Sequence, residues 1–216
     1  MHIPDGFISP KMYLPLYAVA AGCWAWAIRR LRRTLDERTI PWLAVLAALS
    51  FILMMVTIPL PGGSSVHATG ICLLAVVFGV WPAFLAISLV LLIQALLFGT
   101  GGITSLPLNA LAMGLVGGAI AAGVFRTLKG WNETAALAAA AWLSVMVPAF
   151  LVALALGLQP LIASAEDGTP LFFPFGVEVT LPALLLPHAL LGVGEGLLTV
   201  LVYRLVRDLR REGGAA

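Results

Sequence analysis

The chain has 216 residues, of which 61% are hydrophobic and only 10% are charged, and its formal net charge is +2. Soluble domains average about 45–50% apolar and about 25% charged residues, so this composition excludes an ordinary soluble domain. Together with a mean hydropathy of +1.05, it predicts an integral membrane protein with little mass outside the bilayer.

The first six residues, Met1-His2-Ile3-Pro4-Asp5-Gly6, contain the donors of a compact metal chelate. The α-amine of Met1, the backbone amide of His2 and the imidazole Nδ1 of His2 would close two low-strain rings around one ion. A planar set of nitrogen ligands suits Ni(II) or Cu(II) among the divalent metals. The chelate needs a free amine on Met1, and a side chain as bulky as His2 should protect that methionine from removal. The alternative is that a histidine so near the terminus is incidental.

Seven apolar stretches follow, and they approach or reach the roughly 17–25 residues that a helix needs to cross a bilayer. They are Met12–Ile28, Ile40–Leu60, Val66–Val80, Trp81–Phe98, Leu106–Phe125, Thr134–Leu158 and Leu181–Val206. The third is short, and only Trp81-Pro82 separate it from the fourth, so the two form either separate helices or one kinked segment. Because lipid offers no partner to exposed backbone groups, we expect an all-α, polytopic membrane protein with about seven transmembrane helices. Residues 1–216 should form a single transmembrane domain.

Arginine and lysine gather after the first, fifth and seventh stretches. The three groups are Arg29, Arg30, Arg32, Arg33 and Arg38; Arg126 and Lys129; and Arg204, Arg207, Arg210 and Arg211. With seven spans they fall on one side of the membrane, where they hold 11 of the 12 basic residues. The positive-inside rule assigns that side to the cytoplasm. We therefore expect residues 1–10 to lie outside as a metal-chelating segment and residues 207–216 to form a cytoplasmic tail.

Two loops on the expected outer side can approach the N-terminus. The first, residues 61–67, reads Pro-Gly-Gly-Ser-Ser-Val-His. Its last residue, His67, either supplies a fourth nitrogen to the chelate or caps the following helix at the membrane interface. The second, residues 99–105, is rich in glycine, which lets the backbone come close to a neighbour.

Neutral polar residues near these loops have two interpretations. Gln94 and Asn109 lie within or beside apolar stretches, where they either bond neighbouring helices or orient the metal-bound imidazoles. We place both, together with Ser64 and Ser65, as candidate residues behind the metal ligands.

His188 and Glu195 lie seven residues apart in the last stretch and therefore on one helix face. Ionisable groups within a membrane are candidates for function. Glu195 should lie toward the inner half of the membrane, distant from the outer site. We favour a structural or partner-contact role for the pair over a proton or ion relay.

Several segments of the chain resemble the CbiM/NikM family, the substrate-binding membrane subunits of energy-coupling-factor transporters for cobalt and nickel. The most specific match is Met-His-Ile-Pro-Asp-Gly-Phe-Ile-Ser-Pro at residues 1–10. Further matches are residues 61–67, Gln-Ala-Leu-Leu-Phe-Gly-Thr-Gly-Gly-Ile-Thr at 94–104, Asn109 with Met113-Gly114, and His-Ala-Leu-Leu-Gly-Val-Gly-Glu-Gly-Leu-Leu-Thr at 188–199. The resemblance covers nearly the whole chain.

The resemblance implies that Ni(II) or Co(II) is bound as the transported substrate by the Met1 amine, the His2 amide and imidazole, and His67. It implies neither a catalytic cofactor nor catalysis by this chain. The implied partners are a transmembrane coupling subunit, two cytoplasmic ATPases and, in many relatives, a small accessory membrane subunit, of which we see no fused copy after Arg211. No GxxxxGK[ST] motif occurs, so ATP should be hydrolysed elsewhere. The expected location is the cytoplasmic membrane of a prokaryote, among lipid and without nucleic acid.

Two other classes of function compete with metal transport. An intramembrane hydrolase would use Ser64 or Ser65 with a histidine, but His67 is only two or three residues away and no GxSxG or HExxH motif is present. A structural membrane subunit without metal would tolerate an extended N-terminus. The sequence favours metal transport and does not decide between nickel and cobalt.

Overall fold

The computed structural model describes residues 2–32, 36–37, 39–59 and 65–213, which are mostly helical. In chain order the elements are α1 (Pro10–Leu31), α2 (Thr39–Met55), β1 (Ile58–Pro59), β2 (Ser65–Val66), α3 (Ile71–Phe78), α4 (Val80–Phe98), α5 (Leu106–Asn109), the π-helix η1 (Ala110–Val116), α6 (Gly117–Leu128), α7 (Glu133–Gly157), α8 (Gln159–Ile162) and α9 (Val177–Gly213). The expected helical class is confirmed. The two strands form one short antiparallel pair in which Ile58 faces Val66.

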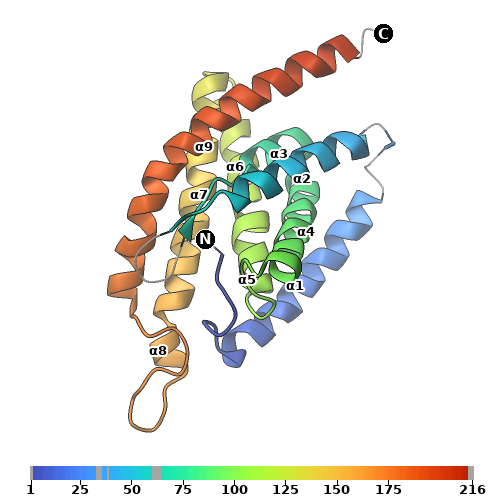
Figure 1. The fold of residues 1–216 in the computed structure, drawn as a ribbon. Coiled ribbons are helices and arrows are strands. Elements are labelled where there is room, and N and C mark those ends of the chain that lie inside the picture. The colour runs from blue at the N-terminus through green and yellow to red at the C-terminus, as the bar shows by residue number, and fades with distance from the viewer. Residues whose placement is uncertain (1, 33–35, 38, 60–64, 214–216) are drawn as a thin grey trace.

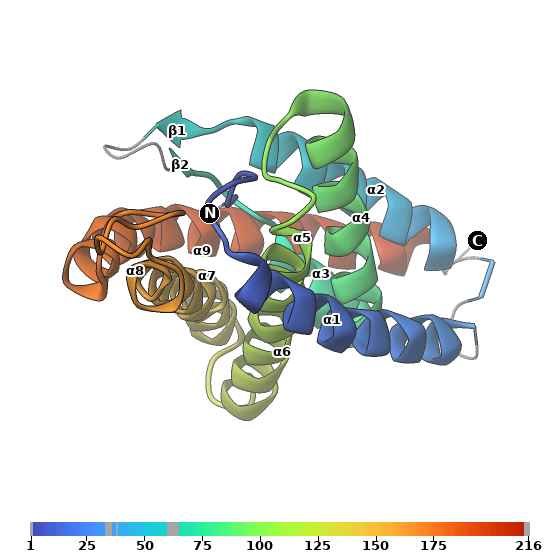
Figure 2. The same ribbon diagram turned by 90° about the horizontal axis from the view of Figure 1, so that it is seen from below.

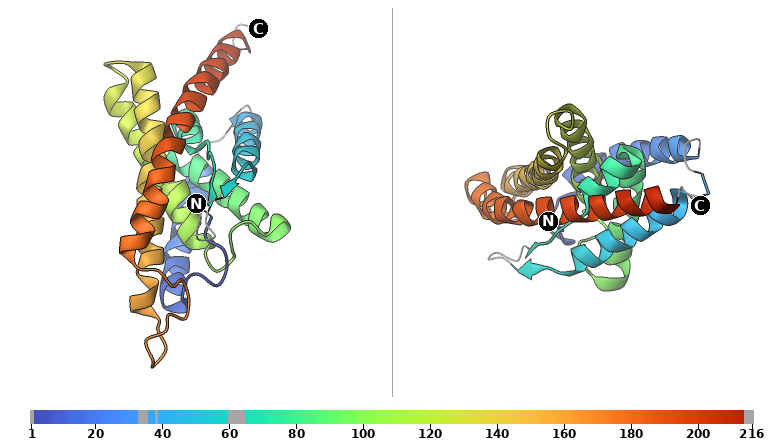
Figure 3. Two further views of the ribbon diagram at one scale, coloured as in Figure 1. Left: turned by 60° about the vertical axis from the view of Figure 1, so that its left-hand side comes forward. Right: turned by 90° about the horizontal axis from the view of Figure 1, so that it is seen from above.

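Helices α7 and α9 lie side by side along one edge of the molecule, and α6 packs against α7 (Figures 1 and 3). On the other side of this layer, α4 packs against η1, α2 and α3. Helices α5, η1 and α6 follow one another without a break over Leu106–Leu128. The π-geometry in the middle of this rod begins directly after Asn109, and π-segments often occur at functional sites.

Within the described residues, four helical segments are long and apolar enough to cross a membrane: Val80–Phe98, Leu106–Leu128, Glu133–Ile162 and Val177–Leu209, with α2 a shorter apolar helix. The expected span at Val66–Val80 is wrong as a helical crossing, because α3 has only eight residues. At 1.5 Å per residue such a helix extends about 12 Å, whereas the hydrocarbon core is about 30 Å thick. Helices α3 and α4 are separate rather than one kinked segment, since Gly79 between them has a φ of +90°.

Helix α9 has two chemically different faces. Five apolar side chains that recur every three or four residues are 58–79% exposed: Leu186, Leu190, Val193, Leu197 and Leu201. Four polar residues of the same helix are buried: Thr180, His188, Glu195 and Thr199. A contiguous exposed stripe of leucine is unusual on a soluble protein. Lipid would cover this stripe, while the polar residues face the rest of the bundle.

Among the residues that the structure describes, members of all three basic groups lie at one end of the bundle. Residues at the ends of α1 and α6 line the same cavity. At the start of α7, which follows directly, Thr134 Oγ1 accepts a hydrogen bond from Arg204 at 2.8 Å and Glu133 pairs with Arg207 at 2.7 Å. The described members of these groups therefore share a side, as expected. That this side is the cytoplasm, with the N-terminus outside, stays a prediction of the positive-inside rule.

Candidate metal centre

Residues 2–9 precede α1 and run from the middle of the bundle, beside α5, α9 and the β1–β2 pair, to the end where α1 begins (Figures 1 and 2). Two apolar side chains anchor this segment, because Ile3 and Ile8 are only 2% and 1% exposed. At its other end, the Ser9 N–H donates to the side-chain oxygen of Gln159 at 2.9 Å. The segment is thus a docked part of the fold, and it places His2 inside the protein.

Asn109 holds the backbone next to His2. Its side-chain oxygen accepts from the Ile3 N–H, and its side-chain nitrogen donates to the Ile3 carbonyl, both at 3.3 Å. The Ser105 hydroxyl donates to the same carbonyl. An amide side chain that satisfies both backbone groups of one residue fixes that residue in place. Asn109 therefore positions His2 through the backbone of its neighbour, with help from Ser105, which the sequence analysis did not single out.

The carboxylate of Asp5 ties the segment to the loop after α4. It accepts hydrogen bonds from the Ile103 N–H at 3.1 Å, the Thr104 N–H at 2.7 Å and the Thr104 hydroxyl. Partial burial acts to raise the pKa of Asp5, but the hydrogen bonds from Thr104 and Ile103 together outweigh it and hold the pKa below its ordinary value. Asp5 is therefore a charged anchor for the docked segment.

Two glycines of this loop allow the segment to come so close. A Cβ on Gly101 would lie 3.5 Å from Cδ2 of His2, and Gly101 also has a φ of +84°. A Cβ on Gly102 would overlap the backbone nitrogen and the carboxylate of Asp5. The glycine-rich composition of residues 99–105 thus has a specific structural reason at Gly102.

Gly102→Ala should therefore weaken nickel binding by about tenfold or more, because the added methyl group displaces Asp5 and with it the docked segment. Overpacking of this kind costs about 1–3 kcal/mol. Calorimetric titration of the purified protein with Ni(II) measures the effect. The matched control is Gly123→Ala on α6, where an added Cβ meets nothing within 4 Å. Equal nickel affinities for the two variants would show that docking of the segment does not govern the site.

The rings of His2 and His67 stack on each other in the interior. Their centroids are 4.4 Å apart and their planes differ by 24°. His67 follows directly on β2, whose pairing with β1 and contact with α9 set its position. Nδ1 of His67 lies 3.1 Å from the Ala68 carbonyl, which assigns the proton to Nδ1 and the lone pair to Nε2. The structure thus brings together two of the three predicted metal ligands.

Several buried polar atoms near His2 lack a hydrogen-bond partner among the described residues: both of its ring nitrogens and Oε1 of Gln94. Burial, and then the positive N-terminus, lower the pKa of His2 to about 3, while the nearby Gln94 amide acts in the opposite direction. The imidazole is therefore neutral near pH 7, which is the form that binds a metal. Buried polar atoms without partners are uncommon in native proteins, and an ion bound at His2 would give this ring a partner.

The structure describes the other candidate residues to different extents. Met1 and Ser64 lie outside the described residues, and Ser65 is in β2 but its side chain is not described. Gln94 is fully buried and donates to the Phe51 carbonyl at 3.3 Å. In the part of the chain that the structure describes, no group of three or more His, Cys, Asp and Glu could hold a metal. An ion at His2 and His67 would therefore need other donors, such as backbone or terminal nitrogens.

Glu195 lies closer to the candidate metal centre than expected. The prediction that it is distant from that site is wrong. Its carboxylate accepts hydrogen bonds from the Thr69 N–H and the Thr69 hydroxyl, both at 2.9 Å, and from the Gly70 N–H at 2.7 Å. Thr69 is two residues after His67, and Gly70 precedes the first turn of α3. A carboxylate at a helix N-terminus is favourable because it satisfies unpaired N–H groups. Glu195 thus fixes the segment that follows His67.

His188 is also fully buried. Its Nδ1 lies 2.6 Å from the Leu184 carbonyl of its own helix, and its Nε2 has no partner among the described residues. His188 and Glu195 both form hydrogen bonds within this chain. Both side chains are fully buried, so neither reaches the surface.

Glu195→Ala should lower the free energy of unfolding by about 3–5 kcal/mol, because three buried donors lose their acceptor. Nickel affinity should fall as well, since the segment carrying His67 is released. Thermal unfolding in detergent and nickel titration provide the two measurements. Gly194→Ala serves as the control, because an added Cβ there meets nothing within 4 Å. A variant as stable as the control would mean that the carboxylate does not support this segment.

Comparisons with known proteins agree with the resemblance found in the sequence. Residues 2–213 match the family model CbiM, described as the cobalt uptake substrate-specific transmembrane region. The chain is 38% identical over 211 residues to the "Probable fused nickel transport protein LarMN" of Lactiplantibacillus plantarum, with 96% of this chain and 64% of that protein covered. It therefore spans under two thirds of the length of this fused relative.

In two further comparisons, the match covers most of this chain and most of the other protein. The chain is 34% identical over 218 residues to the cobalt transport protein CbiM of Desulforamulus reducens, with 98% of this chain and 83% of that protein covered. A crystal structure described as a truncated transition metal transporter matches with a TM-score of 0.93 at 34% identity, covering 96% of this chain and 99% of the other. The fold described above is thus one already found in a transition metal transporter.

Proposed function

Because the chain belongs to the CbiM family of cobalt uptake substrate-specific transmembrane regions, we propose that it is the substrate-binding membrane subunit of an importer for Ni(II) or Co(II). The observation that carries this proposal is the stack of His2 on His67 inside the bundle. The names of relatives support both metals, since LarMN is described as a nickel transport protein and CbiM as a cobalt transport protein. The metal is the cargo of this subunit.

Four nitrogens hold the ion in this proposal: the Met1 amine, the His2 amide, Nδ1 of His2 and Nε2 of His67. The first three belong to the docked segment and the fourth to the segment before α3. A planar set of four nitrogens favours Ni(II). The site is complete only while Ile3 and Asp5 keep their contacts with Asn109 and Thr104. Docking of residues 2–9 and metal binding are therefore coupled.

This sequence contains no phosphate-binding motif of the GxxxxGK[ST] type. In this proposal, the ATP that drives transport is therefore hydrolysed by partner subunits. We assign the chain to the energy-coupling-factor class, in which a transmembrane coupling subunit and two cytoplasmic ATPases act on the substrate-binding subunit. A small accessory membrane subunit completes the assembly in many relatives. The complex operates in the cytoplasmic membrane of a prokaryote.

Calorimetric titration of the purified chain with Ni(II) and with Co(II) tests the function directly. We expect one ion bound per chain, with the tighter of the two being the transported metal. A yellow, diamagnetic nickel complex is the signature of the planar nitrogen set. Absence of binding by both metals would contradict the proposal, and a paramagnetic octahedral nickel spectrum would contradict the planar ligand set.

Metal affinity should rise as the pH climbs from about 5 to about 8. The unfolded reference pKa of histidine is about 6.5, and burial lowers the pKa of docked His2 to about 3. Docking is therefore fully favourable above about pH 6.5 and weakens as the pH falls toward 3, because the undocked segment takes up the proton. The α-amine, with a reference pKa of about 7.7–8.0, must also lose its proton to bind the ion.

Calorimetry in buffers of different ionisation enthalpy counts the protons released on binding. We expect at least one proton at neutral pH, from the amine and the metal-bound amide rather than from His2. An affinity that is flat over this pH range, with no proton released, would mean that carboxylates or water hold the ion.

A further inference from the structure

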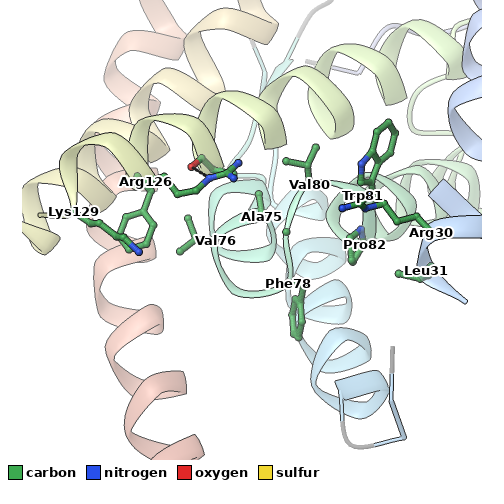
Figure 4. Close-up of a pocket in the computed structure, with 13 residues that line it drawn as sticks. Arg30, Leu31, Ala75, Val76, Phe78, Val80, Trp81, Pro82, Arg126 and Lys129 are labelled. Atoms are coloured by element: carbon green, nitrogen blue, oxygen red, sulfur yellow. Dashed lines mark hydrogen bonds between the residues drawn. The ribbon is translucent and has the colours of Figure 1, made fainter. Parts of the chain in front are cut away.

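A cavity of about 560 Å³ lies at the end of the bundle where α1 and α6 finish (Figure 4). Its walls come from three places: the last turn of α1, the last turns of α6, and the turn that joins α3 to α4. Buried Ala75 and Pro82 form part of its apolar lining. None of the residues of the metal centre lines it, so the cavity is a separate feature of the fold.

The charges around this cavity all have one sign. Its lining includes Arg30, Arg126 and Lys129, and it includes no aspartate or glutamate. Nε of Arg126 donates to the Ala122 carbonyl at 3.1 Å, which fixes the guanidinium beside the cavity. Nζ of Lys129 lies 5.9 Å from the centre of the Phe125 ring. The cavity therefore combines cations with an aromatic and apolar lining. This combination matches a ligand in which an anionic group is attached to a hydrocarbon chain.

Two of these cations, Arg126 and Lys129, differ from Arg207 at the same end. Among the residues that the structure describes, the ion pairs join Arg207 to Glu133 at 2.7 Å and to Asp208 at 3.6 Å, and none reaches Arg126 or Lys129. The exposed positive charges of Arg126 and Lys129 therefore create a positive potential at the cavity. An anion from outside the chain would be attracted to this potential.

Aromatic residues place the cavity at the level of lipid headgroups. Trp81 and Phe78 line it, and Trp131, two residues beyond Lys129, is 87% exposed. Tryptophan is enriched at the interface between membrane and water. Exposed apolar side chains of α1 and α6, Ile28 and Leu128, lie next to the basic residues in sequence and can contact an acyl chain.

We propose that this cavity binds the phosphate group of an anionic phospholipid from the membrane leaflet that faces the basic end of the bundle. Arg30, Arg126 and Lys129 hold the phosphate, while the acyl chains run along the apolar surface below it. Basic pockets between helices on the cytoplasmic side are known to bind such headgroups. This inference is independent of the metal site, because it uses neither its residues nor its loop.

The test measures lipid binding to the delipidated full chain by native mass spectrometry. Phosphatidylglycerol is the anionic probe, and phosphatidylcholine is the neutral comparison. The variant is Arg126→Gln with Lys129→Gln. The matched control is Arg29→Gln with Arg32→Gln, which removes the same charge from the same end but from outside the cavity. Each basic residue near the surface contributes a factor of about five, so the cavity variant should bind phosphatidylglycerol about 25-fold more weakly. The control should change by less than about threefold.

Photolabelling and competition with inorganic phosphate are two further tests that can contradict the proposal. In the unaltered protein, a photoactivatable phosphatidylglycerol should label peptides that contain Trp81 or residues 122–129. Inorganic phosphate at the same concentration as the lipid should not displace it; displacement would assign the site to a free phosphate instead. Equal weakening in both variants, or equal binding of phosphatidylcholine, would overturn the proposal. It would also be overturned by a cavity variant that keeps the lipid but no longer assembles with its membrane partners, since the cavity would then be a protein contact.

Discussion

A three-residue extension, Gly-Ser-Gly, placed before Met1 should abolish high-affinity nickel binding while the protein still folds. The extension converts the Met1 amine into an amide and moves the new terminal amine away from His2. One of the four proposed donors, the Met1 amine, is then lost, and with it the five-membered ring that this amine closes with the His2 amide. We expect the affinity to fall by at least about a thousandfold, or about 4 kcal/mol. Calorimetric titration with Ni(II), with thermal unfolding as the check of folding, measures this effect.

The length of the extension matters for this experiment. A single added residue would place the histidine third from a free amine, where it can form a different planar nitrogen chelate. Three added residues avoid this arrangement. The control is the same Gly-Ser-Gly extension after Ala216, which should leave the affinity unchanged. Equal nickel affinity in the N-terminally extended and unextended proteins would rule out the terminal chelate and favour a structural role for the chain.

The proposed metal donors can be named from the sequence because most of them are near one another in the chain. The amine of Met1 and the amide and imidazole of His2 are joined by a few covalent bonds, so their chelate geometry follows from chemistry alone. The contacts that dock the segment are different in kind. Asp5 meets Thr104 and Ile3 meets Asn109 across about a hundred residues of sequence. No periodicity or spacing within one sequence indicates such pairs.

The error over Val66–Val80 has a physical reason of its own. Hydropathy measures how apolar a stretch is, and it does not show whether lipid or protein covers that stretch. In α3, residues 71–75 are all buried within the bundle, against neighbours such as α4 and α6. The same reasoning explains the misplaced Glu195. The position of Glu195 along the last helix predicted that it lies toward the inner half of the membrane. However, α3 is short and the residues before it are extended, so Thr69 and Gly70 reach the same depth and bond Glu195.

Substitution of the three histidines one at a time should divide them into ligands and non-ligands. His2→Ala removes a nitrogen donor and one chelate ring, so nickel binding should be lost. His67→Ala removes the donor from the other segment and should weaken binding by about 2–4 kcal/mol, or roughly 30-fold to 1,000-fold. Both variants also lose the stack of the two rings at 4.4 Å. His188→Ala should leave nickel affinity within about twofold of the unaltered protein, because Nδ1 of His188 bonds its own helix at Leu184.

The His188 variant also controls for the cost of removing a buried imidazole. All three rings are buried, so each substitution leaves a cavity that lowers the free energy of unfolding, by about 1–4 kcal/mol. If the loss of nickel binding came only from loosened packing, His188→Ala would weaken binding as much as His67→Ala. Calorimetric titrations and unfolding curves of the three variants under one set of conditions separate the two effects. Binding that is lost in His188→Ala and kept in His67→Ala would move the metal centre from the segment before α3 to helix α9.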